Sequence, residues 1–222
     1  DGEVIEDGDK DDFSLSVYCT EDAVGEYVAT LTNEYGTASS QPATLSFVEP
    51  VSPYEEIIVS YNPMAYWRFD DNIAEGVAYD YAGAHHGTYV NFVAEQQIEG
   101  GIADNEGGKA IHLNGPAVNE GDLESYVKTP LQLNDFVVDG AYSISGWVRR
   151  STSYGDYTTR GGYFGQNDLL EFGDKNNTNE IEAWMPGTGT IGGVHNFADD
   201  EWNLIVLTYE FVNGTNTSTL YV

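Results

Sequence analysis

Carboxylate pairs are the first residues of this chain whose types and spacing could do chemistry, because two acids lying close together can divide acid and base roles between them. The candidate pairs are Asp168 with Glu171 and Glu180 with Glu182. Each pair has few partners and lies among many other acids. The adjacent His85 and His86 would point to opposite sides of an extended chain, and no serine or cysteine in a nucleophile elbow lies nearby. We therefore predict that the chain is not an enzyme.

Aromatic side chains offer a second kind of chemistry, because sugar C–H faces stack on rings while sugar hydroxyls pair with polar side chains and backbone. Trp67, Trp147 and Trp202 each lie in a dense apolar run, which favours a place in the core. Trp184, beside a Met-Pro pair at a strand end, is open to both interpretations. The residues that could line a sugar-binding face are Trp184, Tyr163 and His195, with Tyr154 and Tyr157 in the same region.

The charge balance limits the partners. Eight Lys and Arg face 37 Asp and Glu, which gives a net charge of −29 and a pI near 4.1. Phosphate polymers and anionic lipid surfaces would be repelled, so we expect no nucleic-acid partner. Such acidity suits a protein that works outside the cell or meets divalent cations, although solubility alone is a simpler explanation.

Cysteine use and hydropathy add exclusions. Cys19 is the one cysteine, so no intrachain disulfide can form, and no Cys and His spacing indicates zinc. No stretch reaches the ~18 apolar residues of a membrane helix, and no basic-then-apolar signal peptide opens the sequence. We expect no membrane insertion within this chain.

Short alternating runs predict the elements of the N-terminal part. Strands are expected over residues 13–19, from about 26 to 32, and over 41–48. The segment EDAVGEYVATLTNEYGTASSQPATLSF resembles the last three strands of an I-set immunoglobulin-like domain. The resemblance implies a tyrosine corner formed by Asp22, Gly25 and Tyr27. Ala29 stands where that family often has its disulfide cysteine, so this core would depend on packing alone.

A break follows at VEPVSPYEE, which places the domain boundary between residues 1–49 and 50–222. Ser52 before Pro53, with two glutamates next, predicts a two-turn helix from Pro53 to about Ser60. An apolar stripe on this helix would lie on the second domain; its members are Tyr54, Ile57, Ile58 and Tyr61.

Strand-like runs separated by glycine turns fill the rest of the sequence. We expect strands at AYWRFDD (65–71), AYSISGWVRR (141–150) and EWNLIVLTYEF (201–211), and a hairpin formed by GKAIHLNG with SYVKTP. Spacing of this kind is typical of a sandwich or jelly roll. The predicted fold is an all-β antiparallel β-sandwich (jelly roll), preceded by a partial immunoglobulin-like sandwich with one short helix at the junction.

The second part also resembles a known family. AYWRFDD, AYDYAGAHHGTYVN, GKAIHLNG, YVKTP, YSISGWVRR, FADDEWNLIVLTYE and LYV follow one another in the order found in laminin-G-like, concanavalin-A-like lectin jelly rolls. In that family the strand ending in LYV continues into a further strand, so we expect truncation at the C-terminal edge and one unpaired strand edge. The family's jelly-roll glucanases carry an E-x-D-x-x-E pattern that this sequence lacks.

The resemblance implies a function. Such modules belong to bacterial surface proteins, glycan-active enzymes and animal adhesion proteins, where they bind carbohydrate or protein and sometimes calcium. By resemblance the calcium ligands would be Asp80 and Asp71, with Asp70 as an alternative to Asp71. The leading hypothesis is a secreted or cell-surface module for carbohydrate binding or cell adhesion. The alternatives are a structural or protein-binding repeat without glycan affinity, and a module that targets a glycan-active hydrolase.

Overall fold

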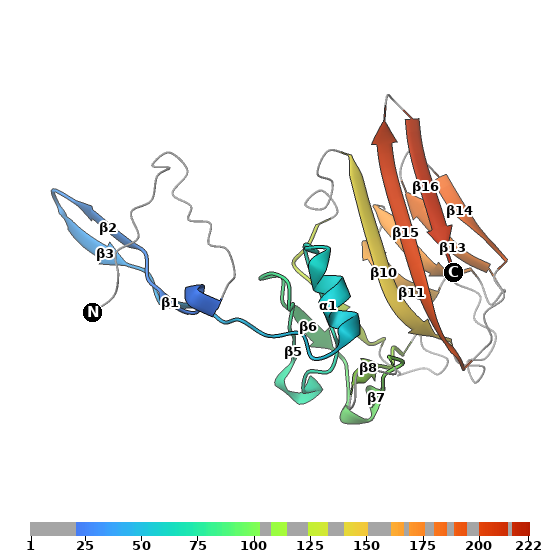
Figure 1. Cartoon of the computed structure of the whole chain (residues 1–222), viewed down its shortest axis with the longest axis horizontal. Helices are drawn as coiled ribbons and strands as arrows, with labels where there is room; N and C mark the ends of the chain where they lie inside the picture. The colour runs from blue at the N-terminus through green and yellow to red at the C-terminus, as the bar shows by residue number, and fades with distance from the viewer. Residues whose placement is uncertain are drawn as a thin grey trace. The chain divides into compact units, whose positions relative to one another are not determined.

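The computed structural model describes residues 21–102, 108–114, 124–132, 140–150, 161–166, 169–175, 180–185, 189–194, 200–212 and 215–222. Within these ranges the chain is all-β with one short α-helix, and its strands pair antiparallel (Figure 1). The prediction of an all-β sandwich with one short helix is confirmed at this level. The chain divides into two compact units, Asp1–Pro50 and Val51–Val222, one residue from the expected boundary. The predicted strand over 13–19, with Cys19, lies outside the described residues.

The first unit consists of short, largely exposed strand pairs. β1 pairs with β4, and β2 pairs with β3 through a turn in which the Asn33 side chain accepts a hydrogen bond from the Tyr35 amide. The Tyr27 hydroxyl donates to the Ala23 carbonyl at 2.6 Å, which is the bond back to upstream backbone that a tyrosine corner makes. The elements are η1 (Glu21–Ala23), β1 (Gly25–Tyr27), β2 (Thr30–Asn33), β3 (Gly36–Ser39) and β4 (Ala43–Leu45).

The predicted helix opens the second unit as α1 (Pro53–Ser60). Ser52 caps it, since the Ser52 hydroxyl accepts from the Glu55 amide at 3.2 Å. Glu55 turns back and accepts from the Val51 amide at 2.6 Å, so the first turn holds the chain that enters it. In the same turn, the Tyr54 hydroxyl accepts a hydrogen bond from the indole of Trp147, a residue of the β-sandwich.

The apolar stripe expected on α1 is only partly correct. Tyr54 and Ile58 are half-buried, but Ile57 is 56% exposed and Tyr61 is 80% exposed. The buried position on this helix belongs to Glu55, at 2% exposure. Ion pairing and hydrogen bonding of the Glu55 carboxylate therefore decide which face of α1 turns inward.

Two antiparallel sheets face each other across the main core. The three-stranded sheet has the order β10-β15-β16, and the four-stranded sheet has the order β11-β12-β13-β14 (Figure 1). Phe172, Ile181, Ile205 and Leu207 are fully buried between them. The strands are β10 (Ala141–Arg149), β11 (Gly161–Gln166), β12 (Leu170–Asp174), β13 (Glu180–Met185), β14 (Gly189–Val194), β15 (Trp202–Val212) and β16 (Thr215–Tyr221).

The part of the chain between α1 and β10 forms a second, smaller hydrophobic core. Ile73, Ala78 and Tyr89 form it, and Trp67 packs against it. The two small sheets around it have the orders β5-β6-β9 and β7-β8. The elements are η2 (Ile73–Glu75), β5 (Val77–Ala78), β6 (Gly87–Val90), η3 (Ala94–Gln96), β7 (Gln97–Glu99), β8 (Lys109–Ile111) and β9 (Tyr126–Lys128).

Two sequence predictions fail in this region. GKAIHLNG and SYVKTP form no strand ladder with each other, because β8 pairs with β7 and β9 pairs with β6; the two segments meet where the Ser125 amide donates to the Asn114 carbonyl at 3.1 Å. Residues 65–71 form no strand and make a single bridge, between Trp67 and Asp80. Phe69 has a left-handed φ of 61°, which interrupts an extended run. The carboxylates of Asp70 and Asp71, which follow Phe69, accept hydrogen bonds from Arg68 and from the Tyr79 amide.

Candidate functional site

Asp80, one of the expected calcium ligands, anchors a turn. Its side chain is fully buried. One carboxylate oxygen accepts from the amides of Tyr66 at 2.8 Å and Ala82 at 3.0 Å, and the other accepts from the His85 amide at 3.1 Å. The His85 ring Nδ1 lies 3.2 Å from that second oxygen. Backbone amides thus bond both oxygens of the Asp80 carboxylate.

The electrostatics of Asp80 follow from these contacts. Burial raises the pKa of the Asp80 carboxyl, but backbone amides, including that of Gly83, outweigh burial and leave the pKa below its usual range. His86 contributes from the other side, since its Nδ1 accepts from the Asp80 amide at 3.0 Å. Both histidines that could have served catalysis are therefore bound to the Asp80 turn.

Asp71, the second expected ligand, also ties chain segments together. It is 8% exposed. Its carboxylate accepts from the Tyr79 amide at 3.0 Å, from the Tyr81 hydroxyl at 2.8 Å and, at 3.4 Å, from the Tyr89 hydroxyl. Burial, together with Asp71 itself, raises the pKa of Tyr81 and of Tyr89, so both phenols stay protonated and donate.

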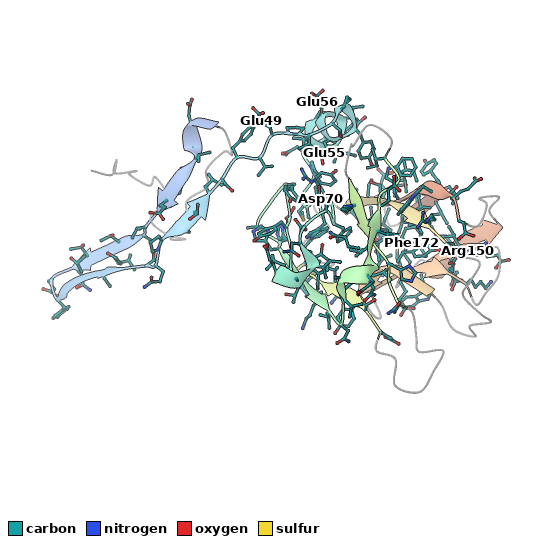
Figure 2. All side chains as sticks on the ribbon, turned by 90° about the horizontal axis from the view of Figure 1, so that it is seen from below. Glu49, Glu55, Glu56, Asp70, Arg150 and Phe172 are labelled. Atoms are coloured by element: carbon teal, nitrogen blue, oxygen red, sulfur yellow. The ribbon has the colours of Figure 1, made fainter. Side chains whose placement is uncertain are left out.

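Asp70 belongs to a third tether. The Arg68 guanidinium donates to Asp70 at 2.7 Å and 3.2 Å, lies 3.4 Å from Glu55, and stacks 4.1 Å above the Tyr81 ring. Figure 2 shows Glu55 and Asp70 approaching from α1 and from the segment that follows Arg68. Burial lowers the pKa of Arg68, but the bond and charge of Asp70, with Glu55, outweigh burial and raise it. Arg68 thus joins α1 to the segment that holds the aspartates.

The structure therefore brings Asp70, Asp71 and Asp80 into one region but fills their oxygens with internal donors. Across the described ranges, no three His, Cys, Asp or Glu side chains are grouped so that they could hold a metal ion. A calcium ion at Asp71 and Asp80 would have to replace N–H and O–H donors that already satisfy both carboxylates. The geometry supports a structural role for this aspartate cluster.

The expected sugar-binding residues lie apart from that cluster and from each other. Trp184 is half-buried on β13, where Ile181, Ala183 and Met185 point into the core, so Trp184 lies on the opposite face of the four-stranded sheet. Tyr163 packs edge-on against Phe172, and its hydroxyl donates to the buried Asp174. The sequence candidates outside the described residues are His195, Tyr154, Tyr157 and Asp168.

The remaining carboxylates of the four-stranded sheet accompany Trp184. Glu171 of β12 pairs in register with Trp184, and Glu182 lies on the same face of β13. Glu180, also on that face, takes an ion pair from Lys175 at 2.9 Å, and this bond raises the pKa of Lys175. Glu180 is thus used for a charge pair.

The tryptophans expected in the core lie at its margins. Trp67 packs on the smaller core and donates to the His85 carbonyl at 3.1 Å. The Trp147 indole donates to the Tyr54 hydroxyl of α1 at 3.1 Å. Trp202 lies beneath the Arg149 guanidinium at 5.1 Å. Each of these three tryptophans is half-buried.

A groove on the three-stranded sheet escaped sequence reasoning. Tyr142, Leu207 and Tyr209 face the core, so alternation places Ser143 and Thr208 on the outer face. This groove measures about 410 Å³ and is called the hydroxyl groove below. Its outward-facing lining is Ser143, Thr208, Glu210, Thr217, Thr219 and Tyr221, completed by Ala141, Tyr142 and Tyr209.

Two tyrosine rings pack on the core face of the same sheet, behind the hydroxyl groove. The rings of Tyr142 and Tyr209 stack at 5.0 Å between centroids, and the Tyr142 hydroxyl donates to the Met185 sulfur at 3.0 Å. Burial, followed by the neighbouring Tyr209, raises the pKa of Tyr142 to about 12. Trp147, which α1 contacts, lies on the same outer face further along β10. The helix therefore meets this face at one end and the groove lies towards the other.

Comparison with known proteins adds no relative to this geometry. No family model, no curated protein and no solved structure matches the chain.

Proposed function

We propose that this chain is a non-catalytic, extracellular carbohydrate-binding or adhesion module of a larger surface or secreted protein. In this proposal residues 1–49 belong to an immunoglobulin-like domain, and residues 50–222 form a laminin-G-like jelly roll. The observation that carries the proposal is the hydroxyl groove. A site for sugar needs a ring for the C–H faces and polar groups for the hydroxyls, and this groove combines both.

The composition of the groove fits a glycan. The groove is open to solvent and has a volume of about 410 Å³. Tyr221 is 55% exposed and presents its ring to solvent at one end. Ser143, Thr208 and Thr219 form one cross-strand row of hydroxyls, in which the Thr208 hydroxyl donates to the Thr219 carbonyl at 3.5 Å and can accept from a ligand. Glu210 adds a carboxylate at the other end.

Non-catalytic binding also agrees with how the acids are used. Asp71 and Asp80 are saturated by amides and phenols, and Glu180 is held by Lys175. A retaining or inverting hydrolase needs two carboxyl groups converging on the scissile bond. In the hydroxyl groove Glu210 is the one acid in the lining.

A glycan array followed by calorimetry tests the proposal. The wild type should bind at least one glycan, and Tyr221→Ala should weaken that binding by roughly 3-fold to 10-fold through loss of ring stacking. Trp184→Ala tests the site expected from the sequence on the other sheet. Tyr61→Ala is the matched control, because it removes an 80% exposed ring from α1. Absence of binding to any glycan, with calcium present, would overturn the proposal.

Protein binding is the second candidate function, and one observation favours it. Ile57, Val59, Tyr61 and Met64 are large apolar side chains exposed on and just after α1. A cluster of exposed apolar side chains is typical of interaction surfaces. Loss of a protein contact in Tyr61→Ala, with glycan binding absent from the wild type, would favour this alternative.

Calcium as a cofactor stays a proposal, and it has its own test. A ligand that binds only the folded state raises the melting temperature. If calcium binds at Asp71 and Asp80, millimolar calcium raises the melting temperature of the wild type but not that of Asp71→Asn. An unchanged melting temperature in the wild type leaves both aspartates with structural roles only.

Within the described ranges, α1 is too short to cross a bilayer, and no other helix there is long and apolar enough to do so.

A further inference from the structure

The hydroxyl groove has an asymmetric electrostatic character. Its lining contains several hydroxyl groups, one carboxylate and no Lys, Arg or His. The carboxylate is that of Glu210, which is exposed and aligned in register with Ala141 and Thr217 on its two neighbouring strands. No positive side chain of the lining is therefore present to receive a sulfate or carboxylate group.

The surrounding charge has the same sign. The chain carries a net charge of −29, so its field repels anions at long range while salt screens it within a Debye length of ~8–10 Å. A sugar ring bound in the groove, by contrast, would lie within direct contact of Glu210. The contact with Glu210 and the long-range field of the chain both oppose an anionic ligand. At high salt the long-range field is screened, and the repulsion by Glu210 at contact remains.

We infer that the hydroxyl groove takes uncharged glycans and excludes sulfated or uronic ones, with Glu210 as the specificity-determining residue. This inference rests on the proposed carbohydrate-binding function and names its ligand class. Serine, threonine and tyrosine side chains pair with sugar hydroxyls without needing charge on the ligand. The Glu210 carboxylate accepts from a neutral hydroxyl but can only repel an anionic substituent at the same place.

The geometry sets the scale of the groove. Tyr221 pairs with Val206, Thr219 with Thr208, and Thr217 with Glu210. Rows two residues apart on a strand are separated by about 7 Å, so the Tyr221 and Glu210 rows lie roughly 13 Å apart. A linear glycan can therefore stack on Tyr221 and still place a further sugar beside Glu210.

The test uses pairs of glycans that share a backbone and differ in charge. The neutral probes are dextran oligosaccharides and the neutral oligosaccharide that binds best on the array, and the anionic counterparts are the sulfated forms of the same oligosaccharides. Binding is measured by calorimetry on the full chain at roughly 50 mM and 500 mM NaCl, because screening separates charge from contact. The variants are Glu210→Gln, which keeps an acceptor, and Glu210→Lys.

Glu201→Lys is the matched control. It makes the same change in net charge as Glu210→Lys but lies just before the opposite end of β15. Melting curves of all variants confirm folding, and both glutamates are exposed, so neither substitution disturbs the core.

We expect a neutral probe to bind with little salt dependence and its sulfated counterpart to bind at least about 5-fold more weakly at low salt. Glu210→Lys should bring the sulfated probe to within about 2-fold of the neutral one, while Glu201→Lys leaves it weak. Tighter binding of sulfated probes by the wild type, or equal effects of the two lysine variants, would overturn the inference and leave the binding function standing. Absence of binding to every glycan of the array would overturn the binding function itself, and this inference with it.

Discussion

Replacing Asp80 by asparagine preserves the shape of the side chain but removes its charge and one acceptor oxygen. In the wild type the two carboxylate oxygens accept from the amides of Tyr66, Ala82 and His85. An asparagine oxygen can serve one side only, so its NH2 group faces amide donors on the other. At least one buried N–H then loses its acceptor, and the remaining bonds lose their charge assistance.

The magnitude follows from these losses. A hydrogen bond to a charged group contributes ~1.5–3 kcal/mol, and stranding a buried donor costs about 1–3 kcal/mol. We expect Asp80→Asn to lower the free energy of unfolding by about 3 kcal/mol, since the turn can admit some water. For a domain of this size that corresponds to a fall in melting temperature of roughly 6–12 °C.

The pH dependence gives a second readout. The pKa of Asp80 is lowered in the folded state, so its contribution to stability is fully present above its unfolded pKa of ~3.9 and is lost as pH falls through the folded value. The difference between wild type and Asp80→Asn should therefore be complete at about pH 7 and shrink below about pH 4.

Urea denaturation of both proteins across this pH range measures the difference, and Glu95→Gln is the control because it removes one charge from an exposed position. A loss below ~0.5 kcal/mol at neutral pH, which is usual for a surface change, would refute the anchoring role of Asp80. So would a difference that stays constant into acid.

Two further substitutions test the tether and the core. Arg68→Met should cost about 3–5 kcal/mol in urea denaturation, because it leaves the Glu55 carboxylate buried without its cation; a cost under ~1 kcal/mol would contradict that pairing. Gly146→Ala should cost about 1–3 kcal/mol, because its Cβ would come within 2.5 Å of the Phe164 ring, whereas Gly193→Ala meets nothing within 4 Å and should be nearly neutral. Equal melting temperatures for the two alanine variants would contradict this prediction, because they would mean that the Phe164 ring can move aside for the added methyl group.

Local signals in the sequence predicted much of the fold. Ser52 followed by Pro53 and acidic residues predicts a helix start, and α1 begins there. This signal is local, because the residues that cap the helix all lie within its first turn. The Tyr27 hydroxyl bond spans four residues and is equally local. Alternating runs predicted β10 and β15 because a strand buried on one face must repeat every second residue.

Strand pairings and contacts between residues far apart in the sequence could not be predicted in the same way. The runs around Lys109 and Val127 are equally compatible with pairing to each other, and the neighbours that they select depend on distant strands. The inward turn of Glu55 depends on Arg68, thirteen residues later. A prediction from the apolar stripe of a helix considers apolar residues only, so it gives no weight to an ion pair such as that of Glu55 with Arg68.

The candidate site shows the same limit. The family resemblance points to Asp71 and Asp80 as calcium ligands, but the donors that fill their oxygens are backbone amides and phenols whose positions the sequence does not reveal. The hydroxyl groove did leave a signal, since Ser143, Thr208 and Thr219 alternate with core residues on their strands. The pairing of β10 with the distant β15, beside β16, was needed to bring them into one row.

The most direct test of the proposed function is a map of the bound glycan by NMR. Backbone amide shifts of the chain are followed during titration with the neutral oligosaccharide that binds best on the array. The account predicts that shifts gather on β10, β15 and β16 around Ser143, Thr208, Thr219 and Tyr221, and that Tyr221→Ala needs roughly 3-fold to 10-fold more glycan to reach the same shifts. Absence of any shift at saturating glycan, or shifts confined to the Trp184 face of β13, would contradict it.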